Sequence, residues 1–163
     1  MRAPAHPNEM RQHVRVRLEL AEPTVARIAR AAGRSALAKF GLENIADIAV
    51  QVISELVTNA YLHARDGDAA LVLRRDGALL YIEVYDSSPA RPALRPARDE
   101  DEHGRGLELV ADLTVSWGSR TARGGKCVWG AVGIADGNTL ALAGKCPCGY
   151  CPQEPYLTAG AFA

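Results

Sequence analysis

Residues 43–64 constrain the fold of this chain most, because their apolar side chains recur every three or four positions. That spacing predicts one long amphipathic helix with a broad apolar face. Glu55 and Asn59 lie one turn apart at the edge of this face, near enough to act on one ligand. Taken alone, the helix leaves two interpretations open: two solvated polar residues, or a carboxylate and a carboxamide that border a cleft.

The composition limits the class of protein. The chain has 163 residues, of which 48% are hydrophobic, so it can form one domain with a real core and an appendage. Its 19 basic and 19 acidic residues balance, which argues against a basic surface for direct nucleic-acid binding. No apolar run reaches the roughly 18 residues that cross a bilayer, and residues 1–12 lack the apolar core of a secretion signal. We expect a soluble cytoplasmic protein without membrane contact.

Hydrophobic periodicity divides the chain into a loose N-terminus at residues 1–12, a domain at residues 13–134 and a tail at residues 135–163. No periodicity survives at residues 87–103, which predicts a functional or disordered loop. Within the domain we predict helices at residues 23–40 and 43–64, a short helix after residue 106, and strands at residues 13–20, 70–75, 79–85, 115–119 and 126–134.

Two motifs could contact a nucleotide. Gly104 and Gly106 precede the short helix, where glycine lets backbone N–H groups approach an anion, and Arg105 can add a charge-assisted contact. A glycine turn that merely starts the helix is the alternative interpretation. Asp86 follows a predicted strand, where its carboxylate could accept a hydrogen bond from an exocyclic amine or simply initiate a turn.

The polar pair on the long helix suits magnesium-dependent chemistry. The neutral oxygen of Asn59 is a ligand that Mg²⁺ accepts alongside waters and phosphate oxygens. The Glu55 carboxylate could orient or deprotonate an attacking hydroxyl group. Together with the two glycines, this pair predicts a site for a magnesium-bound phosphate ligand.

The order of these motifs resembles that of the GHKL (Bergerat-fold) ATPases, and most closely that of the anti-sigma-factor serine/threonine kinases. The stretch at residues 55–64 is similar to the N-box of these kinases, and residues 125–129 are similar to their final strand. The resemblance spans about residues 14–134, most of the chain. It rests on Glu55-x-x-x-Asn59, Asp86 at a strand end, a lid-like loop and Gly104-Arg105-Gly106-Leu107, in that order.

The resemblance implies an α/β (α+β) two-layer sandwich, in which a mixed β-sheet has helices packed on one face. It implies that ATP and Mg²⁺ bind beside the long helix, with residues 87–103 as the ATP lid. By the same resemblance, Asn59 would hold Mg²⁺, Glu55 would be the general base and Asp86 would recognise adenine. The phosphates would be held by Gly104, Arg105, Gly106 and Leu107.

Partners also follow from the resemblance. Kinases of this type bind a sigma factor or phosphorylate a serine of a small anti-anti-sigma (STAS) protein, and so regulate transcription by partner switching. The sequence leaves a homodimer open. It also leaves two alternatives to kinase activity: a noncatalytic partner-binding module with weak or lost nucleotide turnover, and an ATPase without a protein substrate.

Two positions depart from the kinase pattern. Many GHKL proteins continue Asp-x-Gly-x-Gly, whereas residues 86–90 of this chain read Asp-Ser-Ser-Pro-Ala. Without the two glycines the backbone loses its freedom to adopt positive φ, so we expect a reshaped adenine pocket. Cys127 stands where these kinases commonly have a threonine beside the base, and a thiol is a poorer hydrogen-bond partner than a hydroxyl. Both departures favour the noncatalytic alternative, while Glu55 and Asn59 favour the kinase.

The tail carries three cysteines within six positions. Three thiols do not close a structural zinc site, so a fourth ligand would have to come from His6, His13 or a second chain. Absence of metal and redox chemistry are the alternatives. The zinc hypothesis concerns Cys146, Cys148 and Cys151.

Overall fold

The computed structural model describes residues 12–64, 67–89 and 106–134. The bounds of its helices and strands differ from those predicted by hydrophobic periodicity by at most three residues. In chain order the elements are β1 (His13–Glu19), α1 (Val25–Phe40), the 3₁₀ helix η1 (Glu43–Ile45), α2 (Ala46–His63), β2 (Asp68–Asp76), β3 (Leu79–Asp86), α3 (Gly106–Leu113), β4 (Ser116–Ala122) and β5 (Gly125–Gly133).

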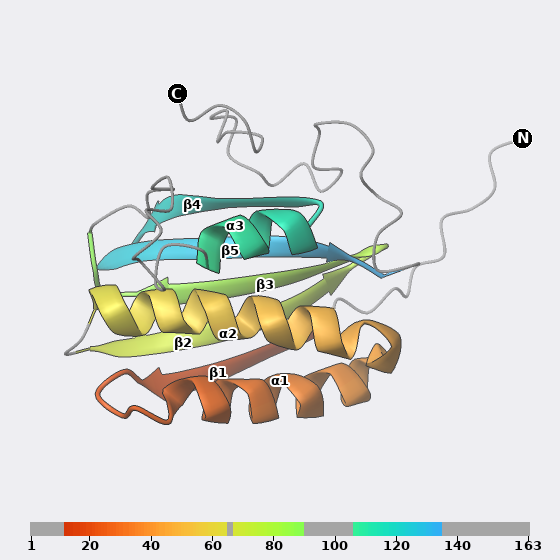
Figure 1. Ribbon diagram of the computed structural model, residues 1–163, viewed down its shortest axis with the longest axis horizontal. Helices are drawn as coiled ribbons and strands as arrows, with labels where there is room; N and C mark the ends of the chain where they lie inside the picture. The colour runs from red at the N-terminus through yellow and green to blue at the C-terminus, as the bar shows by residue number, and fades with distance from the viewer. Residues whose placement is uncertain (1–11, 65–66, 90–105, 135–163) are drawn as a thin grey trace, which may run out of the picture.

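The five strands form a sheet in the order β1-β2-β3-β5-β4, and all four pairings between the described strands are antiparallel. The mixed sheet implied by the resemblance is therefore wrong for this part of the chain. The strand directions follow from the connections (Figure 1). Tight turns join β2 to β3 and β4 to β5, while α1 and α2 run in opposite directions and return the chain antiparallel to β1.

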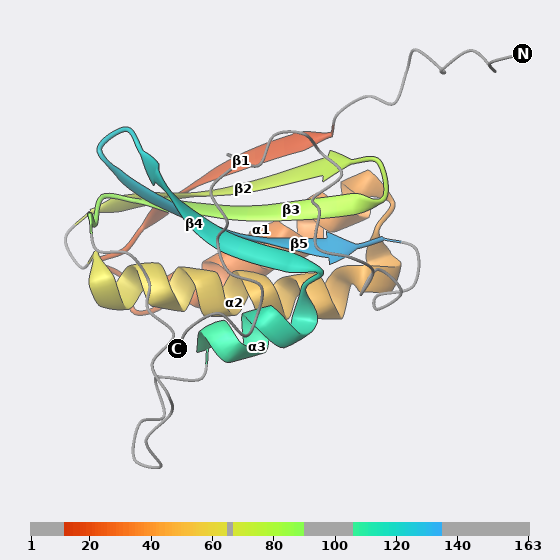
Figure 2. The same cartoon turned by 90° about the horizontal axis from the view of Figure 1, so that it is seen from above.

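All three α-helices lie on one face of the sheet (Figure 1; Figure 2). Helix α1 contacts β1 and β2, α2 contacts β3 and β5, and α3 contacts β4 and β5. This arrangement confirms the predicted two-layer α+β sandwich. The strand side chains that face the helices form the core between the layers, and they include Leu18, Leu71, Leu73, Leu80, Ile82, Val84, Val128 and Val132.

Helix α2 is the central helix of this core. The segment Glu43–His63, which contains it, is long and apolar enough to cross a membrane, with a mean hydropathy of 1.2. The apolar side chains are accounted for by packing, because α2 contacts α1 and α3 on either side and the sheet below. The seven buried residues of the helix are Ala49, Val50, Val52, Ile53, Leu56, Val57 and Ala60.

Candidate functional site

Glu55 and Asn59 lie one turn apart in the C-terminal half of α2, and both side chains are half-buried. Glu55 Oε1 accepts a hydrogen bond from Gln51 Nε2 at 3.0 Å, which orients the carboxylate on the helix surface. Asn59 Nδ2 is buried, and no acceptor among the described residues lies within hydrogen-bond distance of it. A buried donor without a partner is costly, so this carboxamide is available to a ligand.

Gly106 begins α3 and lies against Glu55. A Cβ atom at Gly106 would stand 2.7 Å from Glu55 Oε2, so the missing side chain lets the carboxylate reach the start of this helix. Leu107 follows with its side chain buried in the core, which leaves only its backbone to face an anion. The structure thus brings the long helix and the start of the later helix together. Gly104 and Arg105 lie outside the described residues.

Asp86 ends β3, and its side chain is fully buried on the helix-facing side of the sheet. Its Oδ1 atom accepts two hydrogen bonds, from the backbone N–H of Ser88 at 2.8 Å and from Lys126 Nζ at 3.1 Å. Its Oδ2 atom is also buried, but no donor among the described residues lies within hydrogen-bond distance of it. One carboxylate oxygen is therefore hydrogen-bonded, and the other has no partner among the described residues.

Sequence reasoning missed Lys126, which is 3% exposed and forms a buried ion pair with Asp86. The two residues lie opposite each other in the ladder between β3 and β5. The alternation of side chains along β5 could have indicated its burial, because Lys126 shares a face with Val128 and Val132, which lie in the core. A lysine at such a position is rarely buried unless it is paired.

Cys127 and Asp86 point to opposite faces of the sheet, so Cys127 does not lie beside the carboxylate that was expected to recognise the base. It lies opposite Tyr85 in the ladder and packs with Tyr81 and Trp129 on the face of the sheet away from the helices. Successive strand residues point to opposite faces, which puts Lys126 on the helix side instead. Burial is the main cause that raises the pKa of the Cys127 thiol to about 12, so the sulfur stays protonated at physiological pH.

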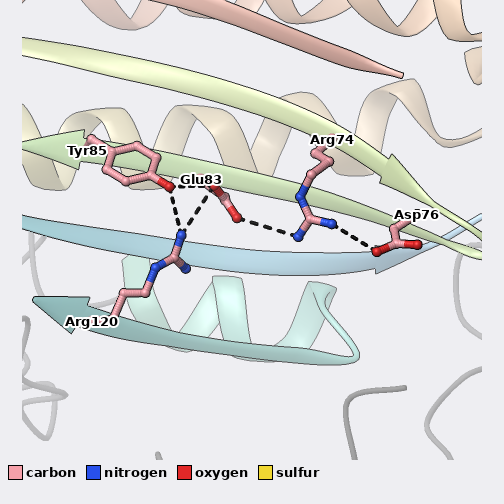
Figure 3. Close-up of polar contacts among 5 residues, drawn as sticks. All are labelled: Arg74, Asp76, Glu83, Tyr85 and Arg120. Carbon is pink, nitrogen blue, oxygen red and sulfur yellow. Dashed lines mark hydrogen bonds and ion pairs between the residues drawn. The ribbon is translucent and has the colours of Figure 1, made fainter. Parts of the chain in front are cut away.

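The face of the sheet away from the helices carries a polar network (Figure 3). Glu83 is 7% exposed and accepts a hydrogen bond from Tyr85 Oη at 2.8 Å. It also forms ion pairs with Arg120 at 3.4 Å and with Arg74 at 3.7 Å. Arg120 donates to Tyr85 Oη at 2.7 Å, and Arg74 donates to Asp76 at 3.0 Å. Each charge is partnered, so this network joins β2, β3 and β4 rather than offering a free group to a ligand.

Two cavities border the pair formed by Asp86 and Lys126. Lys126 and the β4–β5 hairpin line a cavity of about 330 Å³. Asp86 lines a second cavity of about 370 Å³, together with residues of β1 and β2. Ser87 and Gly124 line both. Neither cavity is lined by residues of α2.

Metal ligands were predicted in two places. Among the described residues, no cluster of three or more His, Cys, Asp and Glu side chains could hold a metal ion. The structure therefore gives zinc no support. Mg²⁺ needs fewer protein ligands because it keeps waters and phosphate oxygens, so its site at Asn59 stays a prediction. The predicted zinc ligands Cys146, Cys148 and Cys151 lie outside the described residues.

Gly125 permits the close approach that brings Lys126 opposite Asp86. A Cβ atom at Gly125 would overlap the carbonyl oxygen of Asp86 and stand 2.8 Å from Ser87 Cα. Both are backbone atoms, and the pairing of β3 with β5 prevents Asp86 from moving aside. We expect Gly125→Ala to lower the free energy of unfolding by roughly 3 kcal/mol, measured by urea denaturation.

Gly106→Ala is the matched control for this stability measurement. Its new Cβ atom would meet only the end of the Glu55 side chain, which can rotate away, and alanine is the better helix residue. We expect a change in the free energy of unfolding of less than about 1 kcal/mol. Equal losses of stability in the two variants would contradict the tight contact inferred at Gly125.

The comparisons with known proteins agree with this arrangement. A family model described as the histidine kinase-like ATPase domain matches residues 14–130, more than two thirds of the chain. The match runs from β1 into β5 and includes α2, the end of β3 and α3. No curated protein matches the chain. The chain therefore belongs to the histidine kinase-like ATPase (GHKL) family of ATP-binding domains.

Proposed function

We propose that this protein is an ATP- and Mg²⁺-dependent serine/threonine kinase of the anti-sigma-factor type. One observation carries the proposal: the Glu55 carboxylate lies against Gly106 at the start of α3, one helical turn from the buried carboxamide of Asn59. A carboxylate, a carboxamide and a helix N-terminus then lie close together, and phosphoryl transfer uses such groups as base, metal ligand and phosphate site.

The described residues fit a magnesium-bound nucleotide. The unpaired Oδ2 atom of Asp86 is an acceptor suited to the exocyclic amine of adenine. The Asn59 carboxamide offers an oxygen to Mg²⁺ and a donor to a phosphate oxygen. The first N–H groups of α3 have no acceptor within the helix, which suits the phosphates. The resemblance adds Gly104 and Arg105 to the phosphate site.

Each residue then has one task in the reaction. Glu55 accepts the proton of the substrate hydroxyl group, because Gln51 already engages Oε1 and leaves Oε2 beside α3. Asn59 holds the metal, and Asp86 orients the base. Bound ATP supplies the phosphoryl group while Mg²⁺ neutralises its charge. The chain contributes mainly position and charge, so few reacting side chains are needed.

The proposed partners rest on the N-box resemblance at residues 55–64. The substrate would be a serine of an anti-anti-sigma (STAS) protein, and the competing partner would be a sigma factor held according to nucleotide state. Such a regulator of transcription would work in the cytoplasm. Light scattering at the concentrations used for binding would show whether it works as a monomer or as a homodimer.

A noncatalytic partner-binding module is the second candidate function. Asp86 Oδ1 already accepts two hydrogen bonds from the protein, and residues 86–90 lack the two glycines of the common GHKL pattern. The carboxylate therefore offers a nucleotide fewer acceptor positions than an unpaired one would. A module of this kind would bind its partner without turning over nucleotide.

Nucleotide titration followed by a transfer assay separates these candidates. We expect the full-length chain to bind ATP in the presence of Mg²⁺ more tightly than ADP, and to transfer radiolabelled phosphate to a serine of a STAS protein. Binding without transfer would support the noncatalytic module. Phosphate release without any partner would identify an ATPase. Absence of binding to both nucleotides would refute the kinase proposal.

A further inference from the structure

The buried ion pair between Asp86 and Lys126 joins β3 to β5, but burying it costs free energy. Their side chains are 0% and 3% exposed, and Nζ lies 3.1 Å from Oδ1. Taking two charges out of water is costly, so a buried pair is weak support for stability and is often no better than apolar residues of similar size. Its position at the base site points instead to a task in binding.

The protein treats the two oxygens of Asp86 differently. Oδ1 accepts hydrogen bonds from Lys126 Nζ and from the backbone N–H of Ser88. Oδ2 is buried and receives no hydrogen bond from the described residues. A carboxylate without these donors could rotate and offer either oxygen, whereas two donors on Oδ1 fix its plane and leave one defined acceptor.

We propose that Lys126 is a positioning residue for nucleotide recognition: it anchors Oδ1 of Asp86 so that Oδ2 accepts a hydrogen bond from the exocyclic amine of adenine. This inference rests on the proposed binding of ATP at this site. Lys126 acts through Asp86 and does not itself contact the base. It holds the carboxylate at the point where the chain lacks the glycines of the common GHKL pattern.

The local structure brings the ammonium group to this oxygen. Gly125 has no side chain, so β5 can approach the backbone of Asp86 and Ser87. Lys126 comes next and lies directly opposite Asp86 in the ladder. The backbone N–H of Ser88 is the second donor. Aspartate side chains commonly accept a hydrogen bond from the backbone N–H two residues later in the chain. Lys126 of β5 and the turn after β3 thus both donate to the same oxygen of Asp86.

The test compares ATP with the triphosphate of purine riboside, which lacks the 6-amino group, as ligands of the full-length chain. The wild-type protein should bind ATP roughly 10- to 100-fold more tightly, the usual effect of a hydrogen bond to a charged group. Lys126→Met should bind the two nucleotides almost equally, because its Asp86 carboxylate is no longer held. Isothermal titration calorimetry at a fixed Mg²⁺ concentration measures both affinities, and circular dichroism checks the fold.

Lys126→Arg provides a second variant that keeps the positive charge if Lys126→Met does not fold. The planar guanidinium can engage both oxygens of Asp86, so this variant should also lose the preference for ATP. A purely structural ion pair predicts the opposite, because arginine would preserve it. Lys39→Met makes the same change at an exposed lysine of α1 and should keep the full preference.

The outcomes separate the inference from the function on which it rests. A folded variant at position 126 that keeps the wild-type preference for ATP over purine riboside triphosphate would overturn the role of Lys126. If the wild-type protein prefers neither nucleotide, Oδ2 of Asp86 does not receive the amine, and the inference fails while ATP binding stands. Failure of the wild-type protein to bind either nucleotide refutes the proposed function, and the inference falls with it.

Discussion

Replacing Asn59 by alanine should remove the magnesium dependence of nucleotide binding and leave the fold intact. Mg²⁺ should tighten ATP binding to the wild-type protein and have no such effect on Asn59→Ala. We expect ATP affinity in Mg²⁺ to fall on the order of 100-fold, since even outer-shell partners of a metal ligand contribute roughly 10–100-fold. The fold should survive because Asn59 Nδ2 makes no hydrogen bond to the described residues and alanine favours a helix. Calorimetric titration with and without a chelator measures this effect.

Asn44→Ala is the matched control, because it removes the same group at the other end of the helix. Asn44 lies in η1, about 22 Å from Asn59 along the helical rise, and its Nδ2 donates to the carbonyl oxygen of Ile134 at 3.1 Å. Its loss should lower stability slightly and leave the response to Mg²⁺ unchanged. If Asn59→Ala binds ATP with wild-type affinity and magnesium dependence, Asn59 is not the metal ligand.

The sequence was sufficient to predict the part of the site that lies on one helix. The apolar spacing of residues 43–64 predicts α2, and helical geometry alone then places Glu55 and Asn59 one turn apart. The end of β3 was equally local, because the hairpin turn predicted a strand at residues 79–85 with Asp86 at its end, and the structure extends that strand by one residue to Asp86. No long-range contact was needed for either prediction.

Lys126 and Cys127 show where local patterns become insufficient. Which of these two neighbours faces the helices depends on how β5 pairs with β3, and a shift of one residue exchanges the faces of the whole strand. The resemblance placed Cys127 beside the base, whereas the pairing of Asp86 with Lys126 places the thiol on the opposite face. The buried ion pair depends on the same register, so it could not be predicted before the register was known.

The network around Glu83 was unpredictable for a related reason. Its partners Arg74 and Arg120 lie on β2 and β4, which flank the β3–β5 pair on either side. A sequence pattern can indicate that Glu83 points away from the apolar face of β3, but not which charges meet it there. The antiparallel pairing of β1 with β2 likewise depends on how α1 and α2 return the chain, which is a tertiary property.

Glu55→Gln should separate nucleotide binding from phosphoryl transfer. The substitution preserves the size of the side chain and an oxygen for the Gln51 hydrogen bond, but it removes the carboxylate that would take the proton. We expect ATP affinity to stay close to that of the wild type. Transfer to a STAS serine should slow by roughly 10²–10⁴-fold, the usual contribution of a general base. Single-turnover assays with radiolabelled ATP measure this rate.

Glu43→Gln controls for the loss of one negative charge, because Glu43 is an exposed carboxylate in η1 away from α3. Its transfer rate should equal that of the wild type. Retained transfer in Glu55→Gln would remove Glu55 from the base role, since the loose transition state of phosphoryl transfer can proceed by positioning alone. Weaker ATP binding with an unchanged transfer rate at saturating ATP would have a different meaning. Glu55 would then contribute to the phosphate site through its contact with the start of α3, and it would not take the proton.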